Sequence, residues 1–192
     1  MDKNAKIYVA GHHGLVGSAI WKNLQEKGYT NQVGRTHKEL DLLDGAAVKQ
    51  FFDEEMPEYV FLAAAFVGGI MANSIYRADF IYKNLQIQQN VIGESFRHQV
   101  KKLLFLGSTC IYPRDAEQPM KEDVLLTSPL EYTTDAFYRT QVHIFTHGLP
   151  ISFFQAVCQV NFTDPSKLHN LGWHHKIDIE EGVQRMYEWY LG

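Results

Sequence analysis

The sequence predicts an α/β fold, a doubly wound parallel sheet with helices on both faces. Short and almost continuously apolar runs occur at KIYVA (6–10), EYVFLAAA (58–65) and KKLLFLG (101–107), as is typical of parallel strands that are covered on both sides. Longer stretches with helical periodicity separate these runs. Alternation of the two patterns indicates strand-helix-strand units around one parallel sheet.

Start and stop signals delimit the helices between these strands. An apolar stripe that begins at Leu15 ends at Gly28, a residue type that is common just past helix ends. A second helix is predicted over 46–55, and Pro57 prevents its continuation. A third and longer helix is predicted over 80–98. The predicted order of elements is therefore β-α-β-α-β.

The remainder of the chain is less regular. Periodicity fades over 108–134, where Pro, Asp and Ser are frequent, and we expect a loop region there. The last segment, DIEEGVQRMYEWYLG (178–192), regains helical periodicity, and Asp178 and Glu181 have the spacing of a capping box. The sequence therefore predicts a terminal helix that docks on the domain.

Composition limits the classes of function. A chain of 192 residues with 45% hydrophobic content can bury one core, with room for a small appendage. A formal charge of −4 without any Lys/Arg block argues against binding to nucleic acid or to a membrane surface. Small molecules or other protein chains are the expected partners. No apolar stretch has the length of a signal-peptide core or of a membrane span, which favours the cytoplasm.

Metal binding is not expected. The two cysteines, Cys110 and Cys158, have no metal-ligand spacing and are expected to be reduced thiols. The paired histidines at 12–13 and 174–175 have no third ligand at a suitable spacing. Adjacent histidines in such contexts are more typical of hydrogen-bonding loops.

The segment AGHHGLVGSAI (10–20) carries the strongest functional signal. It places Gly11, Gly14 and Gly17 directly after a strand and at the start of a helix. This G-x-x-G-x-x-G spacing allows a tight turn, a close approach of the backbone to a pyrophosphate and close packing of the helix on the sheet, with the phosphates at the helix N-terminus. The pattern predicts a Rossmann-like, NAD(P)-binding fold. The alternative is a glycine-rich turn without a ligand.

About two dozen residues after the glycine segment, in VGRTHKEL, a further strand is expected to end, and the residue there bears on the choice of cofactor. Sites that prefer NAD usually carry Asp or Glu there to bind the ribose hydroxyls, whereas this chain has Arg35. A cation suits the 2′-phosphate of NADP, which is therefore the predicted cofactor. His13 and His37 would assist only when protonated, since a neutral histidine is a weak phosphate partner. The alternative is an arginine that is simply solvated.

A polar segment, GSTCIYP, follows the third apolar run. It places Ser108, Thr109 and Cys110 at the carboxyl edge of the sheet, where open α/β folds bind their ligands. A hydroxyl there can hold a substrate carbonyl, and a thiol can act as acid or base if its pKa is tuned. The alternative is a turn built from small residues.

Six stretches together resemble one known family: AGHHGLVGSAI, RTHKELDLLD, LAAAFVGGIMAN, DFIYKN, KLLFLGSTCIYP and, near the C-terminus, LHNLGWHHKIDIEEGV. They resemble the GDP-L-fucose synthases, which are extended short-chain dehydrogenases/reductases. The resemblance implies an NADP-binding Rossmann domain over 1–135, a divergent bridge over 136–165, and a remnant of the end of the C-terminal substrate domain, with its terminal helix, over 166–192. Most of the substrate lobe is expected to be missing through an internal deletion. Members of the family are typically homodimers.

The resemblance also implies a reaction and its catalytic residues. GDP-4-keto-6-deoxy-D-mannose is epimerised at C3 and C5, and NADPH then reduces the C4 ketone to give GDP-L-fucose. Cys110 matches the cysteine that exchanges protons beside the carbonyl, and Ser108 matches the serine that steadies the carbonyl. Thr109 belongs to the same catalytic segment.

Cofactor contacts follow from the same resemblance. The pyrophosphate loop runs from Gly11 to Gly17, Asp41 and Leu42 lie near the adenine, and Ala63–Ala65 back the nicotinamide half. The family commonly has arginine where His13 stands. The implied cofactor-binding residues are Gly11, His12, His13, Gly14, Leu15, Val16, Gly17, Arg35, Asp41, Leu42, Ala63, Ala64, Ala65, Leu106 and Gly107.

One departure from the family concerns the proton donor. The Tyr-x-x-x-Lys pair of the family falls on Phe137 and Gln141. Phenylalanine has no proton to donate, and glutamine has no charge with which to lower a tyrosine pKa. We therefore expect no measurable synthase turnover. The interpretations that remain open are an active synthase, a catalytically dead NADP-binding member, and a truncated product without function.

Overall fold

The computed structural model describes residues 1–108, 112–124, 127–128, 154–156, 164–177, 181–185 and 188. Five strands form one sheet in the order β2-β1-β3-β4-β5, and every pairing is parallel. The predicted fold class, a parallel α/β sheet, is confirmed. The strands are β1 (Ile7–Ala10), β2 (Gln32–Val33), β3 (Tyr59–Leu62), β4 (Lys102–Ser108) and β5 (Phe154–Ala156).

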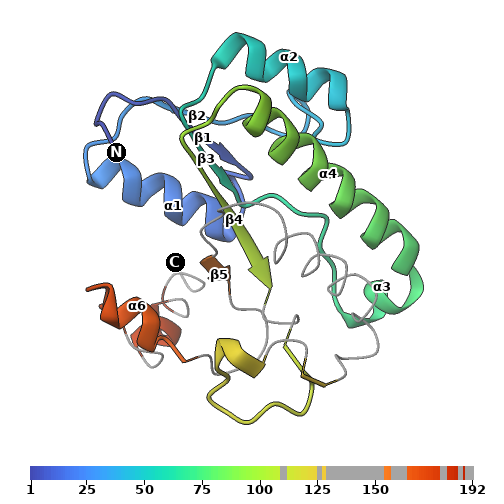
Figure 1. Cartoon of the computed structure of the whole chain (residues 1–192), viewed down its shortest axis with the longest axis vertical. Helices are drawn as coiled ribbons and strands as arrows, with labels where there is room; N and C mark the ends of the chain where they lie inside the picture. The colour runs from blue at the N-terminus through green and yellow to red at the C-terminus, as the bar shows by residue number, and fades with distance from the viewer. Residues whose placement is uncertain are drawn as a thin grey trace.

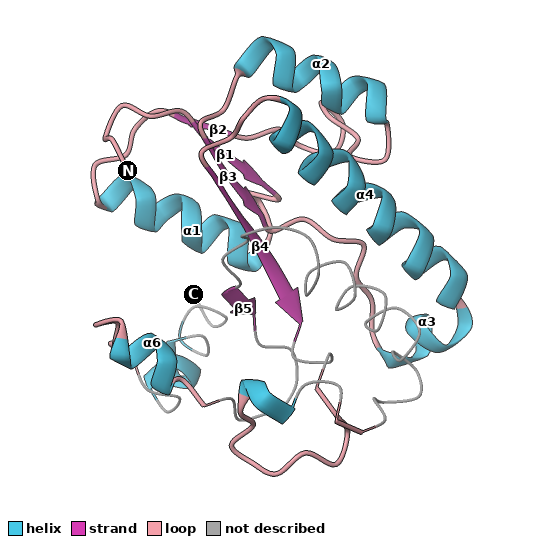
Figure 2. Cartoon of the chain, in the orientation of Figure 1, coloured by secondary structure: helices cyan, strands magenta, loops and turns pink. Residues whose placement is uncertain are grey.

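Helices cover both faces of the sheet, with α1 on one side and with α2 and α4 together on the other (Figures 1 and 2). The described helices are α1 (Leu15–Glu26), α2 (Gly45–Glu55), α3 (Ile70–Ile75), α4 (Arg77–Arg97) and α6 (Ser166–Asn170), with a short 3-10 turn, η2, over Glu122–Val124. Residues 181–185 and 188 are also helical. Val183 there is 61% exposed, so at this position the predicted apolar face is not buried.

Alternate side chains of β1 pack into two separate hydrophobic cores, one on each face of the sheet. Ile7 and Val9 of β1 point to the α1 side, where they cluster with Leu24. Their neighbours Tyr8 and Ala10 point to the opposite side, where residues of α2 and α4 cover them. Because both faces of β1 are buried, its sequence is apolar throughout, as the sequence pattern indicated.

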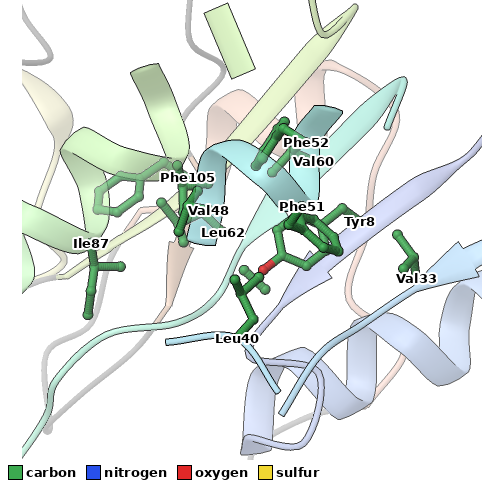
Figure 3. Close-up of a cluster of buried hydrophobic side chains, with 12 residues drawn as sticks. Tyr8, Val33, Leu40, Val48, Phe51, Phe52, Val60, Leu62, Ile87 and Phe105 are labelled. Atoms are coloured by element: carbon green, nitrogen blue, oxygen red, sulfur yellow. The ribbon is translucent and has the colours of Figure 1, made fainter. Parts of the chain in front are cut away.

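The larger core lies between the sheet and the two helices α2 and α4 (Figure 3). Tyr8 packs at a ring-centroid distance of 4.5 Å from Phe51 and at 6.0 Å, edge to face, from Phe52. Burial raises the pKa of the Tyr8 hydroxyl well above its usual range, against the opposing charge of Arg35. The side chains of this core are Tyr8, Ala10, Val33, Leu40, Val48, Phe51, Phe52, Val60, Leu62, Ile87, Val91 and Phe105.

Two elements differ from the sequence prediction. Helix α3 falls in the segment 66–76, for which no helix was predicted, and α4 begins at Arg77 rather than at residue 80. The N-cap of α3 is Gly69, and the helix is only six residues long, so its sequence contains too little of a periodic pattern to be recognised.

His98 joins the end of α4 to α2. Its Nε2 lies 2.9 Å from Asp53 Oδ1, and its Nδ1 lies 2.9 Å from the Glu94 carbonyl oxygen. Both partners are acceptors, so the ring donates to both of them only when both of its nitrogens are protonated and it carries a positive charge. Burial opposes this charge, but the hydrogen bonds to Asp53 and Glu94 outweigh burial and raise the His98 pKa.

The raised pKa of His98 predicts that the His98–Asp53 pair stabilises the fold more in mild acid than in mild base. Its stabilising effect is complete below the pKa of an unfolded histidine and is lost as pH rises through the folded pKa. We expect His98→Gln to lower the free energy of unfolding by about 1 kcal/mol more at about pH 6 than at about pH 8.5. Urea unfolding at the two pH values measures the difference.

His37→Gln is the matched control, since His37 also faces a carboxylate, at 3.7 Å from Asp41, but is 80% exposed. This variant should show no such pH dependence. An equal loss of stability in His98→Gln at both pH values would mean that folding does not raise the His98 pKa.

Candidate functional site

The candidate site lies at the carboxyl ends of β1 and β3. In the strand order β2-β1-β3-β4-β5, the chain moves to one side of β1 for β2 and to the other side for β3. The loops that follow β1 and β3 therefore leave the sheet in opposite directions, and open α/β folds bind ligands in the crevice between such loops. Gly11 directly follows β1, and Ala63 directly follows β3.

The glycine loop is packed so closely that side chains are excluded at two positions. Gly11 has φ +82°, and a Cβ there would lie 2.8 Å from the Ala63 carbonyl oxygen. A Cβ on Gly17 would lie 2.0 Å from the Gly11 carbonyl oxygen. These contacts draw the start of α1 against the sheet, which is the role assigned to the spaced glycines from the sequence.

The N-terminus of α1 faces this crevice without a side-chain cap. Gly14 is the N-cap residue and makes no side-chain hydrogen bond, and its N–H donates to the Gly11 carbonyl at 2.9 Å. The first N–H groups of α1 therefore have no capping side chain, and Leu15 beside them is 82% exposed. Uncapped N–H groups at a helix start are suited to a phosphate group.

The two histidines of the loop differ in their surroundings. The His12 ring packs between His13, at a centroid distance of 4.0 Å, and Trp21, at 5.2 Å. It lies directly over Gly34, where a Cβ would come within 2.6 Å of His12 Nδ1. Among the described residues this buried Nδ1 has no hydrogen-bond partner.

The charge of His12 is suppressed by its environment. Burial lowers its pKa, and the positive charges of His13 and Arg35 lower it further. Glu39 opposes the decrease without cancelling it. A neutral His12 forms a wall of the site and is a poor partner for a phosphate at neutral pH.

Arg35, the predicted partner of a 2′-phosphate, forms an ion pair with Glu55 of α2 in this structure. Its Nη2 lies 2.5 Å from Glu55 Oε1 at the end of α2, and its Nη1 donates to the Gly34 carbonyl at 3.0 Å. The guanidinium also lies 5.5 Å from the centre of the Phe51 ring. The side chain therefore follows α2 and does not extend over the glycine loop.

The segment predicted to lie near an adenine is held by α4. Asn90 Nδ2 donates to the Leu42 carbonyl at 2.8 Å, and Gln86 Nε2 donates to the Leu43 carbonyl at 2.8 Å. Asp41 Oδ1 accepts from the Leu43 N–H at 2.9 Å. The backbone of Leu42 and Leu43 is thus tied to α4, and Asp41 is tied to Leu43.

The loop after β3 is clamped by a single buried side chain, Asn84 of α4. Its Oδ1 accepts from the Phe66 N–H at 2.8 Å, and its Nδ2 donates to the Phe66 carbonyl at 2.7 Å. Ala63 N–H donates to the Ala10 carbonyl at 3.0 Å, which ties the start of the loop to β1. Ala63–Ala65 therefore lie between two fixed points. The sequence analysis did not single out Asn84, although an amide within a buried helix face is a usable signal.

The end of β4 brings the third predicted motif to the same edge of the sheet. Leu106, Gly107 and Ser108 pair in parallel register with Phe154, Gln155 and Ala156 of β5. Ser108 is the last residue of β4, so its backbone is placed at the carboxyl edge. The predicted positions Thr109, Cys110, Phe137 and Gln141 lie outside the described residues.

Comparison with known proteins decides the family of the chain. Residues 7–149 match the NAD dependent epimerase/dehydratase family. The chain belongs to this family. The match includes the glycine loop, the β3 loop and the end of β4, so the crevice described above lies within the matched part of this epimerase/dehydratase chain.

Several individual proteins resemble this chain over part of their length. GDP-L-fucose synthase 1 of Arabidopsis thaliana is 63% identical over 134 residues, which are 70% of this chain and 42% of the relative. The structure of MlghC, a GDP-mannoheptose C4 reductase from Campylobacter jejuni with NADP bound, is 45% identical with a TM-score of 0.73, and the match covers 82% of this chain and 52% of that chain. A GDP-L-fucose synthetase from Naegleria fowleri bound to NADP is 26% identical with a TM-score of 0.66, at 82% and 51% coverage. The chain thus spans about half the length of these relatives, or less.

Two further features concern the described part of this epimerase/dehydratase chain. No helix in it is long and apolar enough to cross a bilayer. It also contains no cluster of three His, Cys, Asp or Glu side chains arranged to hold a metal ion. His174 and His175 do lie near His169, at ring-centroid distances of 4.8 and 5.8 Å.

Proposed function

We propose that this chain binds NADPH in the manner of the cofactor-binding half of a GDP-L-fucose synthase, and that it does not itself turn over the GDP-sugar. The observation that carries the proposal is the close approach of Gly11 to the Ala63 carbonyl, beside the uncapped N-terminus of α1. Such an arrangement at the switch point of a sheet is suited to the binding of a pyrophosphate.

The preference for NADP over NAD has two supports. The two solved structures described above have NADP bound. In this chain the position after β2 carries Arg35 and no acidic residue that would bind ribose hydroxyls. Asp41 and Leu42 would lie near the adenine, and Ala63–Ala65 would back the nicotinamide ring.

We expect no turnover because this chain lacks the proton donor that the reaction needs. In the proposed reaction the C4 ketone receives a hydride from NADPH, and an acid must protonate the resulting alkoxide. Phe137 and Gln141 stand where the resemblance places that acid and the cation that tunes it. Loss of a general acid typically lowers a rate about 10²- to 10⁴-fold. Ser108 and Cys110 would still hold the carbonyl and exchange protons beside it.

Thermal unfolding with NADPH and with NADH tests cofactor binding. At a concentration about 100 times the dissociation constant, NADPH should stabilise the chain by roughly 2.7 kcal/mol and raise its Tm by about 5–10 °C. NADH at the same concentration should raise it less. A Tm that is indifferent to both nucleotides would overturn the proposal.

NADPH oxidation in the presence of GDP-4-keto-6-deoxy-D-mannose tests turnover separately. We expect no steady oxidation above the background without sugar. Steady oxidation that requires the sugar and disappears in Ser108→Ala would show that the chain is an active synthase.

We also propose a cytoplasmic location, a homodimer, and the three-part division at residues 135 and 165.

The homodimer is supported by exposed apolar side chains along α3 and the start of α4, namely Met71, Ile75, Tyr76 and Tyr82. Light scattering after size-exclusion chromatography measures the mass, and a mass of 22.1 kDa would mean a monomer.

A further inference from the structure

Glu55 holds two cations at the end of α2. Its Oε1 pairs with Arg35 Nη2 at 2.5 Å, and its Oε2 pairs with Lys6 Nζ at 3.1 Å. The Glu55 side chain is 22% exposed, while those of Lys6 and Arg35 are 33% and 36% exposed. The carboxylate is therefore partly shielded from water and bridges the two cations.

The ion pair with Glu55 holds the Arg35 guanidinium on the side of the sheet opposite to the glycine loop, at its amino edge. Lys6 directly precedes β1, and its carbonyl accepts from the Glu58 N–H at 2.9 Å, so the end of α2 lies at the amino edge of the sheet. The glycine loop lies at the opposite, carboxyl edge. Arg35 follows β2 by two residues, and its guanidinium is turned back along α2.

Arg35 nevertheless remains within electrostatic reach of the site. Its charge contributes to lowering the pKa of both His12 and Glu39, which lie at the rim. Glu39 does not compete for the guanidinium in this structure, because Oε2 of Glu39 accepts from both the N–H and the hydroxyl of Thr36, at 2.7 and 2.8 Å.

We propose that Glu55 is a specificity-determining residue that competes with the 2′-phosphate of NADPH for Arg35. This inference rests on the proposed NADP site. NADPH must break the Arg35–Glu55 pair to recruit the guanidinium, whereas NADH has no 2′-phosphate and leaves the pair intact. Lys6 keeps Glu55 paired after Arg35 has turned away, which limits the cost of the exchange. Glu55 thus reduces the discrimination between the two nucleotides.

Glu55→Gln tests the competition by removing the charge that holds Arg35. Isothermal titration calorimetry would measure the dissociation constants of NADPH and NADH, and those of 2′,5′-ADP and 5′-AMP as adenosine fragments with and without the 2′-phosphate. We expect about 2- to 5-fold tighter binding of NADPH and 2′,5′-ADP, the range of a partly exposed ion pair. Binding of NADH and 5′-AMP should not change.

Glu54→Gln is the matched control. It removes the same charge from the adjacent position of α2, where Glu54 Oε1 accepts from Gln50 Nε2 at 2.8 Å. Because Glu54 is not bonded to Arg35 or Lys6 in the described structure, all four dissociation constants should match those of the unmodified chain.

Lys6→Met should shift specificity in the opposite direction. Without Lys6, the Glu55 carboxylate has Arg35 as its remaining cation and holds it more strongly. We expect weaker binding of NADPH and 2′,5′-ADP, by about 2- to 5-fold, with unchanged binding of NADH. A merely structural role of Glu55 would not produce opposite changes in these two variants.

The same binding measurements distinguish a failure of the Glu55 proposal from a failure of the NADP site. If the unmodified chain binds NADPH and Glu55→Gln leaves its affinity unchanged, or tightens NADH equally, Glu55 does not determine specificity and the NADP site stands. If the unmodified chain binds neither NADPH nor 2′,5′-ADP, the proposed function itself fails.

Discussion

Gly17→Ala is expected to abolish NADPH binding and to lower the free energy of unfolding by about 2–3 kcal/mol. The added Cβ would lie 2.0 Å from the carbonyl oxygen and 2.6 Å from the carbonyl carbon of Gly11. Both atoms belong to the backbone and cannot move aside as a side chain would. The start of α1 must therefore shift away from β1, and its N–H groups lose their position over the crevice.

Gly93→Ala supplies the control for this prediction. Gly93 also lies inside a helix, α4, but a Cβ there meets nothing within 4 Å. Alanine should stabilise this helix by up to about 1 kcal/mol and leave NADPH binding unchanged. Urea unfolding and calorimetric titration of NADPH measure both variants. A Gly17→Ala chain that binds NADPH normally would show that the close contact at Gly11 is not needed by the site.

Asn84→Leu is expected to lower the free energy of unfolding by about 3 kcal/mol and to weaken NADPH binding at least about 10-fold. Asn84 is 2% exposed, and its amide satisfies both the N–H and the carbonyl of Phe66. Leucine fills a similar volume but leaves these two polar groups without their partner. The loop that carries Ala63–Ala65 would then lose its anchor on α4.

Two measurements localise the effect of Asn84. Amide hydrogen exchange at Phe66 should become faster in Asn84→Leu, because its N–H loses its acceptor. Asn73→Ala is the control, since Asn73 Nδ2 of α3 donates to the Gly68 carbonyl of the same loop at 2.9 Å but, unlike Asn84, is only partly buried. It should cost less than about 1 kcal/mol and leave Phe66 exchange unchanged. Unchanged exchange in Asn84→Leu would mean that other contacts hold the loop.

The regular elements could be predicted because their causes are local. The run at 6–10 is apolar because both faces of β1 are buried, and the structure places β1 at Ile7–Ala10. The predicted helix over 46–55 is α2 (Gly45–Glu55), which Asp44 caps by accepting from the N–H groups of Ala46 and Ala47. Helix α3 was missed because six residues are too few to display a period.

The candidate site could be predicted only in outline. Its backbone parts, the glycine loop and the end of β4, follow from the ends of strands and were located correctly along the chain. The predicted roles of individual residues remain predictions, including those of Ser108, Cys110 and Asp41. Arg35 was considered as a phosphate partner or a solvated residue, and its pairing with Glu55 was not foreseen.

The sequence by itself determined the class of fold and the position of the glycine loop, because apolar periodicity and glycine spacing are patterns of neighbouring residues, and the resemblance of its motifs indicated the family. Only the tertiary structure decided which distant polar groups meet. Asn84 reaches Phe66 across 18 residues of sequence, and Arg35 reaches Glu55 across 20. Such pairs form because packing of helices on the sheet brings them within hydrogen-bond distance, and no local pattern encodes that distance. The cofactor specificity that we infer depends on these long-range contacts.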